Sequence, residues 1–274
     1  MASSTEAQRT IATGVAMGVD ISLNYPLWIA AKRLGVGLTA FPSSVREIYR
    51  GGGSLWLSLA PTVIVEDKVT RIMQENLSPT TPLHGLWCAA SSGAVAAACV
   101  TSQVEHVITA AHTKSLPIHE TVRKLWQQRG PFSLLIPPGI GMMMGREIPF
   151  AASLFWLQPN LKQTIQNVWP TKENNQEDKT CFMSPSNLLK CAITGFGTSV
   201  IATPISHVPS VVAAYQQGHG LGVHKAIQEL LAVGGPRELW RGLVARTLSL
   251  AGTLTVVPIV LDALAPRDEL KDNQ

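Results

Sequence analysis

Charged residues are scarce in this sequence. Asp, Glu, Lys and Arg make up 15% of its 274 residues, whereas 46% are hydrophobic and the mean hydropathy is +0.17. A chain so apolar lacks the composition of a disordered protein. The 22 Lys and Arg residues occur in small groups and never form a long basic run, so no nucleic-acid partner is expected despite the net charge of +4.

Cysteines are few, and residues arranged for catalysis are missing. The four cysteines, Cys88, Cys99, Cys181 and Cys191, form no C-x-x-C pair and have no metal-ligand spacing, so we expect structural thiols and no metal site. The sequence contains no Ser/His/Asp triad, nucleotide fingerprint or pair of catalytic carboxylates. These absences argue against an enzyme, and no cofactor is expected.

Long stretches without any charge are the main positive feature. A helix that crosses the hydrocarbon core needs about 20 predominantly apolar residues. Stretches of this kind cover residues 11–31, 55–73, 77–104, 131–161, 191–224 and 247–261, if Asp20 is allowed in the first, a charged end after Val65 in the second, and Arg146 with Glu147 in the fourth. They are rich in Gly, Ala, Ser and Thr, which suit close helix packing in a membrane bundle. The sequence therefore predicts an all-α membrane protein with six transmembrane helices.

The segments that follow the first, third and fifth span are basic. We count twelve basic residues against five acidic ones in them, with Lys32 and Arg246 among the twelve. By the positive-inside rule these three segments face the cytoplasm-like side, which in a mitochondrion is the matrix.

The basic segments also mark an internal repeat. Ile48-Tyr49-Arg50-Gly51 in the first copy corresponds to Leu239-Trp240-Arg241-Gly242 in the third, and Pro137-Pro138-Gly139 stands at this place in the second. The pattern predicts three αα repeats, at 1–76, 77–166 and 188–274, with a polar loop at 167–187 between the second and third. Because a positive helix end meets basic residues after Gly51, Gly139 and Gly242, we expect lipid binding there, with cardiolipin as the candidate.

These residues resemble the mitochondrial carrier family, and the resemblance covers nearly the whole chain. It is carried by Gly14 to Arg33 with Pro26, by Arg146-Glu147-Ile148-Pro149-Phe150, and by Leu239-Trp240-Arg241-Gly242-Leu243. The resemblance implies a carrier-like fold with pseudo-threefold symmetry. It also implies that Arg146, Ser58 and Ser249 occupy equivalent positions facing a substrate cavity, where His207 or Asn24 could assist. An internal ion pair of Arg146 with Glu147 or Asp20 is the competing interpretation.

The gate charges of the family are mostly missing. Of the Pro-x-acid-x-x-base signature, the alignment keeps Pro26, Glu105 and Pro204, and Ala31 stands at the base position of the first repeat. Of the signature on the even helices only Lys162 and Asp262 fit. Replacing both partners of a buried ion pair by apolar groups can be neutral or stabilising, by about 1 to 4 kcal/mol. The losses are thus typical of a permanently packed gate.

The sequence favours a non-transporting structural subunit of a large mitochondrial inner-membrane assembly, such as a respiratory complex or the ATP synthase. Its partners would be other subunits and membrane lipids. Two alternatives stay open: an active carrier that exchanges a small anionic metabolite, and an outer-membrane relative that acts as a receptor or in membrane remodelling. Asp20, the lone charge of the first span, is expected to hydrogen-bond to a neighbouring helix rather than to relay protons.

Overall fold

The computed structural model describes residues 2–80, 83–169 and 185–264, and every regular element within these ranges is helical. The elements in chain order are α1 (Ala2–Gly35), α2 (Val45–Ile48), α3 (Gly52–Asn76), α4 (His84–Ala96), the π-helix η1 (Ala97–Thr101), α5 (Ser102–Thr113), α6 (Ile118–Arg129), α7 (Phe132–Leu135), α8 (Ile140–Ala152), the π-helix η2 (Ser153–Leu157), α9 (Gln158–Val168), α10 (Pro185–His219), α11 (Val223–Gly234), the 3₁₀-helix η4 (Gly235–Trp240) and α12 (Leu243–Leu264). The polar loop expected at 167–187 falls largely on 170–184, outside the described residues.

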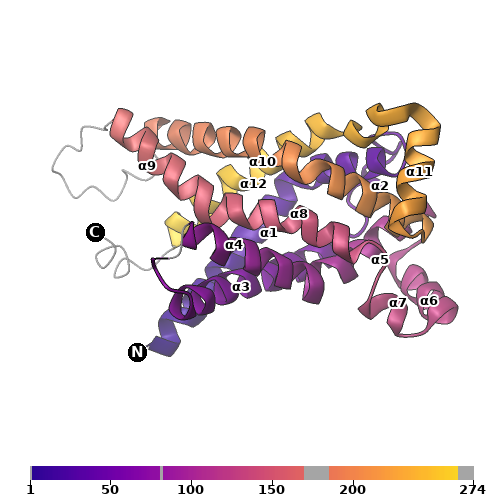
Figure 1. The fold of residues 1–274 in the computed structure, drawn as a ribbon, viewed down its shortest axis with the longest axis horizontal. Helices are drawn as coiled ribbons and strands as arrows, with labels where there is room; N and C mark the ends of the chain where they lie inside the picture. Colours follow the sequence, from indigo (N-terminus) through magenta and orange to yellow (C-terminus); the bar gives the residue numbers. More distant parts are fainter. Residues whose placement is uncertain (1, 81–82, 170–184, 265–274) are drawn as a thin grey trace.

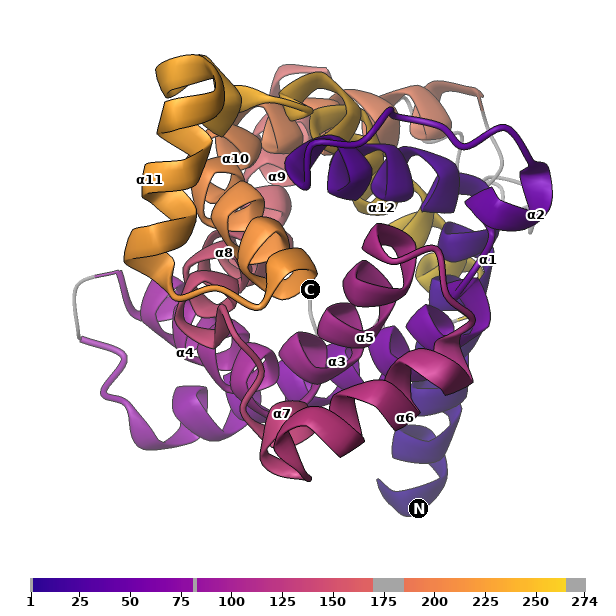
Figure 2. The ribbon, with the colours of Figure 1, turned by 90° about the vertical axis from the view of Figure 1, so that its right-hand side faces the viewer.

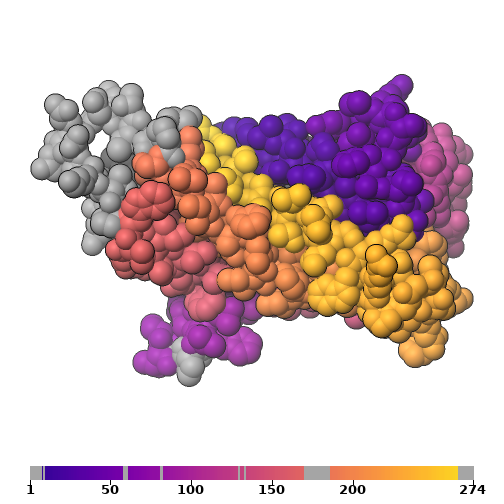
Figure 3. Space-filling model, turned by 90° about the horizontal axis from the view of Figure 1, so that it is seen from above, coloured from indigo at the N-terminus to yellow at the C-terminus, as the bar shows by residue number. Residues whose placement is uncertain are grey.

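The long helices form a closed ring. Around the ring α1 packs against α3, α3 against α4, α4 against α8, α8 against α10 and α10 against α12, and α12 returns to α1. Figure 1 shows these helices running along the long axis of the molecule, and Figure 2 shows the ring from one end. In Figure 3, α12 lies between α1 and α10 on one face. The first and last helices of the chain thus pack side by side.

Glycines let neighbouring helices of the ring approach closely. A Cβ at Gly93 of α4 would lie 2.5 Å from the backbone oxygen of Glu147 on α8. A Cβ at Gly195 of α10 would likewise lie too close to Thr255 of α12, and one at Gly252 of α12 would lie too close to Asn24 of α1. These contacts explain the abundance of small residues in the apolar stretches, since a larger side chain would force the helices apart.

The ring is polar inside and apolar outside. Buried residues include the ionisable side chains of Asp20, Lys32, Glu66, Glu105 and Arg146, each at most 6% exposed. Large apolar side chains such as those of Leu23, Ile201, Ile205 and Val244 are exposed. This is the reverse of a water-soluble protein, in which Lys, Arg, Asp and Glu are almost never fully buried.

Three of the helical segments are long and apolar enough to cross a membrane. They are His84–Thr113, which comprises α4, η1 and α5, then Ser186–His219 in α10 and Leu243–Leu264, which is α12. Together with the apolar exterior, they indicate a helical membrane protein.

Shorter helices lie at one end of the ring. Figure 2 shows α6 and α11 around its rim, and each has 12 residues, whereas α2 has only four. The short spacing between Pro26 and Arg50 explains the difference, because few residues remain there for a surface helix once α1 continues to Gly35.

Candidate functional site

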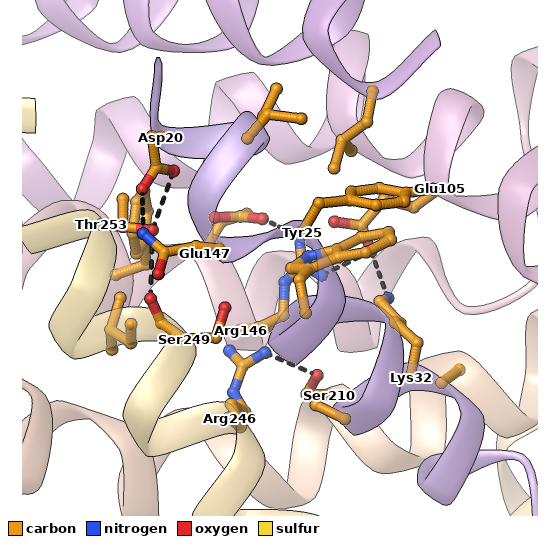
Figure 4. A pocket seen from close by; sticks show the side chains of 18 of the residues that line it. Asp20, Tyr25, Lys32, Glu105, Arg146, Glu147, Ser210, Arg246, Ser249 and Thr253 are labelled. Atoms are coloured by element: carbon orange, nitrogen blue, oxygen red, sulfur yellow. Dashed lines mark hydrogen bonds and ion pairs between the residues drawn. The ribbon is translucent and has the colours of Figure 1, made fainter. Parts of the chain in front are cut away.

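A cavity of about 110 Å³ lies inside the ring. Its wall is built by side chains of α1, α3, α5, α8, α10 and α12 (Figure 4). The ionisable acids and bases that line it are Asp20, Glu105, Glu147, Lys32, Arg146 and Arg246, together with His207. Acidic and basic residues other than histidine are equal in number, so the lining has no formal net charge when all six are ionised.

Four of these residues form a continuous ion-pair network: Lys32, Glu105, Arg146 and Glu147. The ammonium of Lys32 on α1 donates to the carboxylate of Glu105 on α5. A guanidinium nitrogen of Arg146 on α8 lies 2.5 Å from the same carboxylate oxygen, and the other terminal nitrogen donates to Glu147. Each charge in the network therefore has an opposite partner, and three ring helices are tied together through Glu105.

Two further charges in the cavity are held by neutral groups, and we call Asp20 and Arg246 the hydroxyl-bound charges. The Asp20 carboxylate accepts a hydrogen bond of 2.6 Å from the Asn24 amide and one of 3.0 Å from the Thr253 hydroxyl of α12. The expected hydrogen bond of Asp20 to a neighbouring helix is thus confirmed. Figure 4 shows this group on the opposite side of the cavity from Lys32 and Glu105.

Arg246 in the first turns of α12 points toward α10. Its guanidinium donates to the Ser210 hydroxyl at 2.9 Å and to the Ser206 hydroxyl at 3.2 Å. Both of these partners of Arg246 are neutral hydroxyl groups.

Beside the cavity lies one more carboxylate, that of Glu66 in the middle of α3. Glu66 is completely buried, and neither of its carboxylate oxygens has a hydrogen-bond partner among the described residues. The charges that act most directly on it are those of Glu147 and Arg146.

The structure places the sequence-predicted cavity residues as follows. Arg146 and Ser249 both line the cavity, and both are buried. Ser58 belongs to α3, but its side chain lies outside the described ones. Of the two competing ion pairs of Arg146, the one with Glu147 is present, while Asp20 bonds to Asn24 and Thr253 instead.

The predicted gate remnants do not lie together in the structure. Glu105 lies in the ion-pair network, while Pro26 is half-buried on α1 and Pro204 is exposed on α10. Lys162 of α9 and Asp262 of α12 form an exposed ion pair of 3.3 Å. The two residues therefore connect α9 and α12 at the ring end opposite α6 and α11.

The three glycines of the predicted lipid sites share one backbone conformation. Gly51, Gly139 and Gly242 have φ values of 86°, 87° and 86°, which L side chains rarely adopt, and each immediately precedes a long helix. A cavity of about 450 Å³ adjoins the second glycine at Pro138 and is also lined by Lys114 and His219.

Three ionisable residues in or beside the cavity were not predicted from the sequence to lie there. Lys32 and Arg246 were assigned to the basic segments that follow the first and fifth spans, and this was wrong. Because α1 continues to Gly35 and Arg246 is the fourth residue of α12, both side chains belong to long helices and line the cavity. Glu66 was placed in the charged end of the second span, whose charge-free part stops at Val65, but it lies in the middle of α3, which continues to Asn76. An acid that follows Val63, Ile64 and Val65 was the available signal for a buried carboxylate.

Comparisons with known proteins give no family assignment: no protein-family model matches the chain, and no curated protein matches it significantly. Within the part of the chain that the structure describes, no three His, Cys, Asp or Glu side chains lie where they could hold a metal ion. The function must therefore be inferred from the geometry of the cavity.

Proposed function

We propose that this protein is a degenerate, non-transporting relative of the mitochondrial carriers that serves as a structural subunit of a large inner-membrane assembly. In this proposal six helical rods, α1, α3, α4–α5, α8–α9, α10 and α12, cross the membrane as three repeats. At 1.5 Å per residue, even the 22-residue α12 reaches about 33 Å, enough for the hydrocarbon core of about 30 Å. Some of the charges that lower the hydropathy of α1, α3 and α8–α9 are buried and do not face lipid, namely Asp20, Lys32, Glu66, Arg146 and Glu147.

The three glycines support a pseudo-threefold arrangement. A Cβ on Gly51 would contact Ile108 of α5, one on Gly139 would contact Ala213 of α10, and one on Gly242 would contact Leu34 of α1. The start of each even helix thus packs against the odd helix of the next repeat, and the third returns to the first. A cyclic set of contacts of this kind is what three equivalent repeats require.

The observation that carries the non-transporting role is the neutralised state of Arg146. Glu105 and Glu147 already occupy its guanidinium, so binding an anion there requires breaking buried ion pairs. The cavity of about 110 Å³ is also smaller than the roughly 300 to 1,000 Å³ of small-molecule sites. A network that holds three helices together suits a rigid block better than one that must alternate between two arrangements.

Native gel electrophoresis tests the structural role. Native membranes solubilised in mild detergent should show this chain co-migrating with a complex of many hundreds of kilodaltons, whose other subunits mass spectrometry would identify. Migration alone, near the 29.4 kDa of the chain plus its detergent, would overturn the proposal.

Lipid binding belongs to the same proposal. Basic Lys114 and the start of α8 after Gly139 lie near the cavity of about 450 Å³, where an anionic headgroup such as that of cardiolipin would meet positive charge. Native mass spectrometry should detect retained cardiolipin, with less of it in Lys114→Gln than in the exposed control Lys225→Gln. Equal retention in both variants would contradict this site.

One observation favours an anion carrier as a second candidate. Arg246 faces the cavity and is bonded to Ser206 and Ser210 rather than to a carboxylate, so its charge is the more available one. Purified protein in liposomes would then exchange small anionic metabolites, and Arg246→Gln would abolish uptake with folding intact. Wild-type protein that takes up none of them excludes this candidate.

A further inference from the structure

The carboxylate of Glu66 is buried and has no hydrogen-bond partner among the described residues. It is 0% exposed, and neither oxygen accepts a hydrogen bond from any described residue. An ionised carboxylate transferred to an apolar interior without partners costs so much free energy that such groups neutralise instead. Burial without a partner therefore points to an uncharged Glu66.

The charge balance of the interior leads to the same conclusion. The six charged residues that line the cavity sum to zero when all are ionised, and Arg146 is already shared between Glu105 and Glu147. Adding an ionised Glu66 gives one more negative charge than there are cations. A single bound proton removes this excess and leaves the ion-pair network unchanged.

We propose that Glu66 is a proton-binding site, in which the side chain is kept as a neutral carboxylic acid next to Glu147 and Arg146. The ligand is a proton rather than a metal ion, because a hard cation needs several oxygen ligands and the described residues gather no such cluster. This inference holds whether or not the protein transports a solute.

Helices around Glu66 determine what loss of the proton would do. From α8, Arg146 would attract an ionised Glu66 and Glu147 would repel it. Of the helices packed against α3, α1 contributes Asp20 and Lys32 to the cavity and α5 contributes Glu105. The remaining two are α4, which carries His84 and Cys88, and η1, which carries Cys99. An ionised Glu66 would compete with Glu105 and Glu147 for Arg146, so proton release is coupled to rearrangement of the ion-pair network.

Infrared spectroscopy tests the site directly. In D₂O at pH 8, the folded wild-type protein should show the carbonyl-stretch band of one protonated carboxylic acid. Glu66→Gln should lose this band, whereas Asp20→Asn and the exposed variant Glu75→Gln on the same helix should keep it. A wild-type spectrum without the band, or a band that persists in Glu66→Gln, would overturn the proposal.

Chemical labelling gives a second test that needs no variant to fold. Dicyclohexylcarbodiimide partitions into apolar regions and modifies carboxyl groups in their protonated form. Peptide mapping after treatment of the wild-type protein at pH 8 should find Glu66 modified and Glu147 unmodified.

Thermal unfolding gives a third test. Glu66→Gln, which mimics the neutral acid, should keep the wild-type unfolding temperature. Modification of Glu147 with Glu66 untouched, or a large loss of stability in Glu66→Gln, would contradict a protonated Glu66.

Discussion

Two groups of charges share the cavity, and they are stabilised in different ways. The ion-pair network of Lys32, Glu105, Arg146 and Glu147 is held by opposite charges from three helices. The hydroxyl-bound charges, Asp20 and Arg246, are held by amide and hydroxyl groups. Asp20 is as deeply buried as the residues of the network, so burial alone does not distinguish the two groups. They differ in the kind of partner that holds each charge.

The two groups should respond differently when one charge is removed. In the network, removal of one charge leaves a partner that is buried and uncompensated, and this typically costs about 3 to 5 kcal/mol. A hydroxyl-bound charge can be replaced by a neutral polar group, because its partners hydrogen-bond to either. The network should therefore control the stability of the ring, and the hydroxyl-bound charges should contribute little to it.

The largest expected effect is that of Glu105→Gln. The substitution leaves Lys32 without an opposite charge and Arg146 with only Glu147, so we expect a loss of about 3 to 5 kcal/mol in the free energy of unfolding. Denaturant titration in mild detergent measures it, with exposed Glu120→Gln as the control. A loss below about 1 kcal/mol would show that the two groups of charges do not differ.

A smaller loss is expected when Lys32 is removed together with Glu105. The double variant Lys32→Met/Glu105→Gln retains Arg146 with Glu147 as a neutral pair, so it should be more stable than Glu105→Gln alone. The single variants and the double variant form a cycle that gives the coupling energy of the pair. Additive losses would mean that Lys32 and Glu105 act independently, despite their contact.

Local sequence features predicted much of the fold. Charge-free stretches located the apolar helices, and Gly51, Gly139 and Gly242 marked the start of three long helices, because a positive φ is a local property of the backbone. The limits of helices were less predictable. Lys32 and Arg246 look like ends of basic loops, since a charged residue in sequence gives no sign that it turns inward on a helix.

The partners in the cavity could not be predicted for a different reason. Arg146 was identified as a cavity residue, but its contact with Glu105 joins positions 41 residues apart, and that of Lys32 with Glu105 joins positions 73 apart. Such pairs depend on how whole helices are rotated about their axes. The Asp20 bond to Thr253 joins positions 233 apart and exists only because the ring closes.

Asp20→Asn should have a modest effect. The amide keeps an oxygen for the Thr253 hydroxyl and removes a buried charge, so we expect a change within about 1 kcal/mol, in contrast to Glu105→Gln. The same denaturant titration measures it. A loss as large as that of Glu105→Gln would indicate that Asp20 has a charged partner when the protein is folded, and would merge the two groups of charges into one.

The smallest effect is expected for Lys162→Met. Lys162 and Asp262 also form an ion pair, with 3.3 Å between the ammonium nitrogen and a carboxylate oxygen. Unlike the residues of the network, their side chains are 42% and 43% exposed. Water already solvates both charges, so separating them should cost at most about 0.5 kcal/mol, and less at high salt. A cycle with Asp262→Asn measures the coupling energy for comparison with that of Lys32 and Glu105. A coupling energy above about 2 kcal/mol would mean that bound lipid or another subunit shields this end of the ring from water, because only exclusion of water makes an ion pair of this geometry strong.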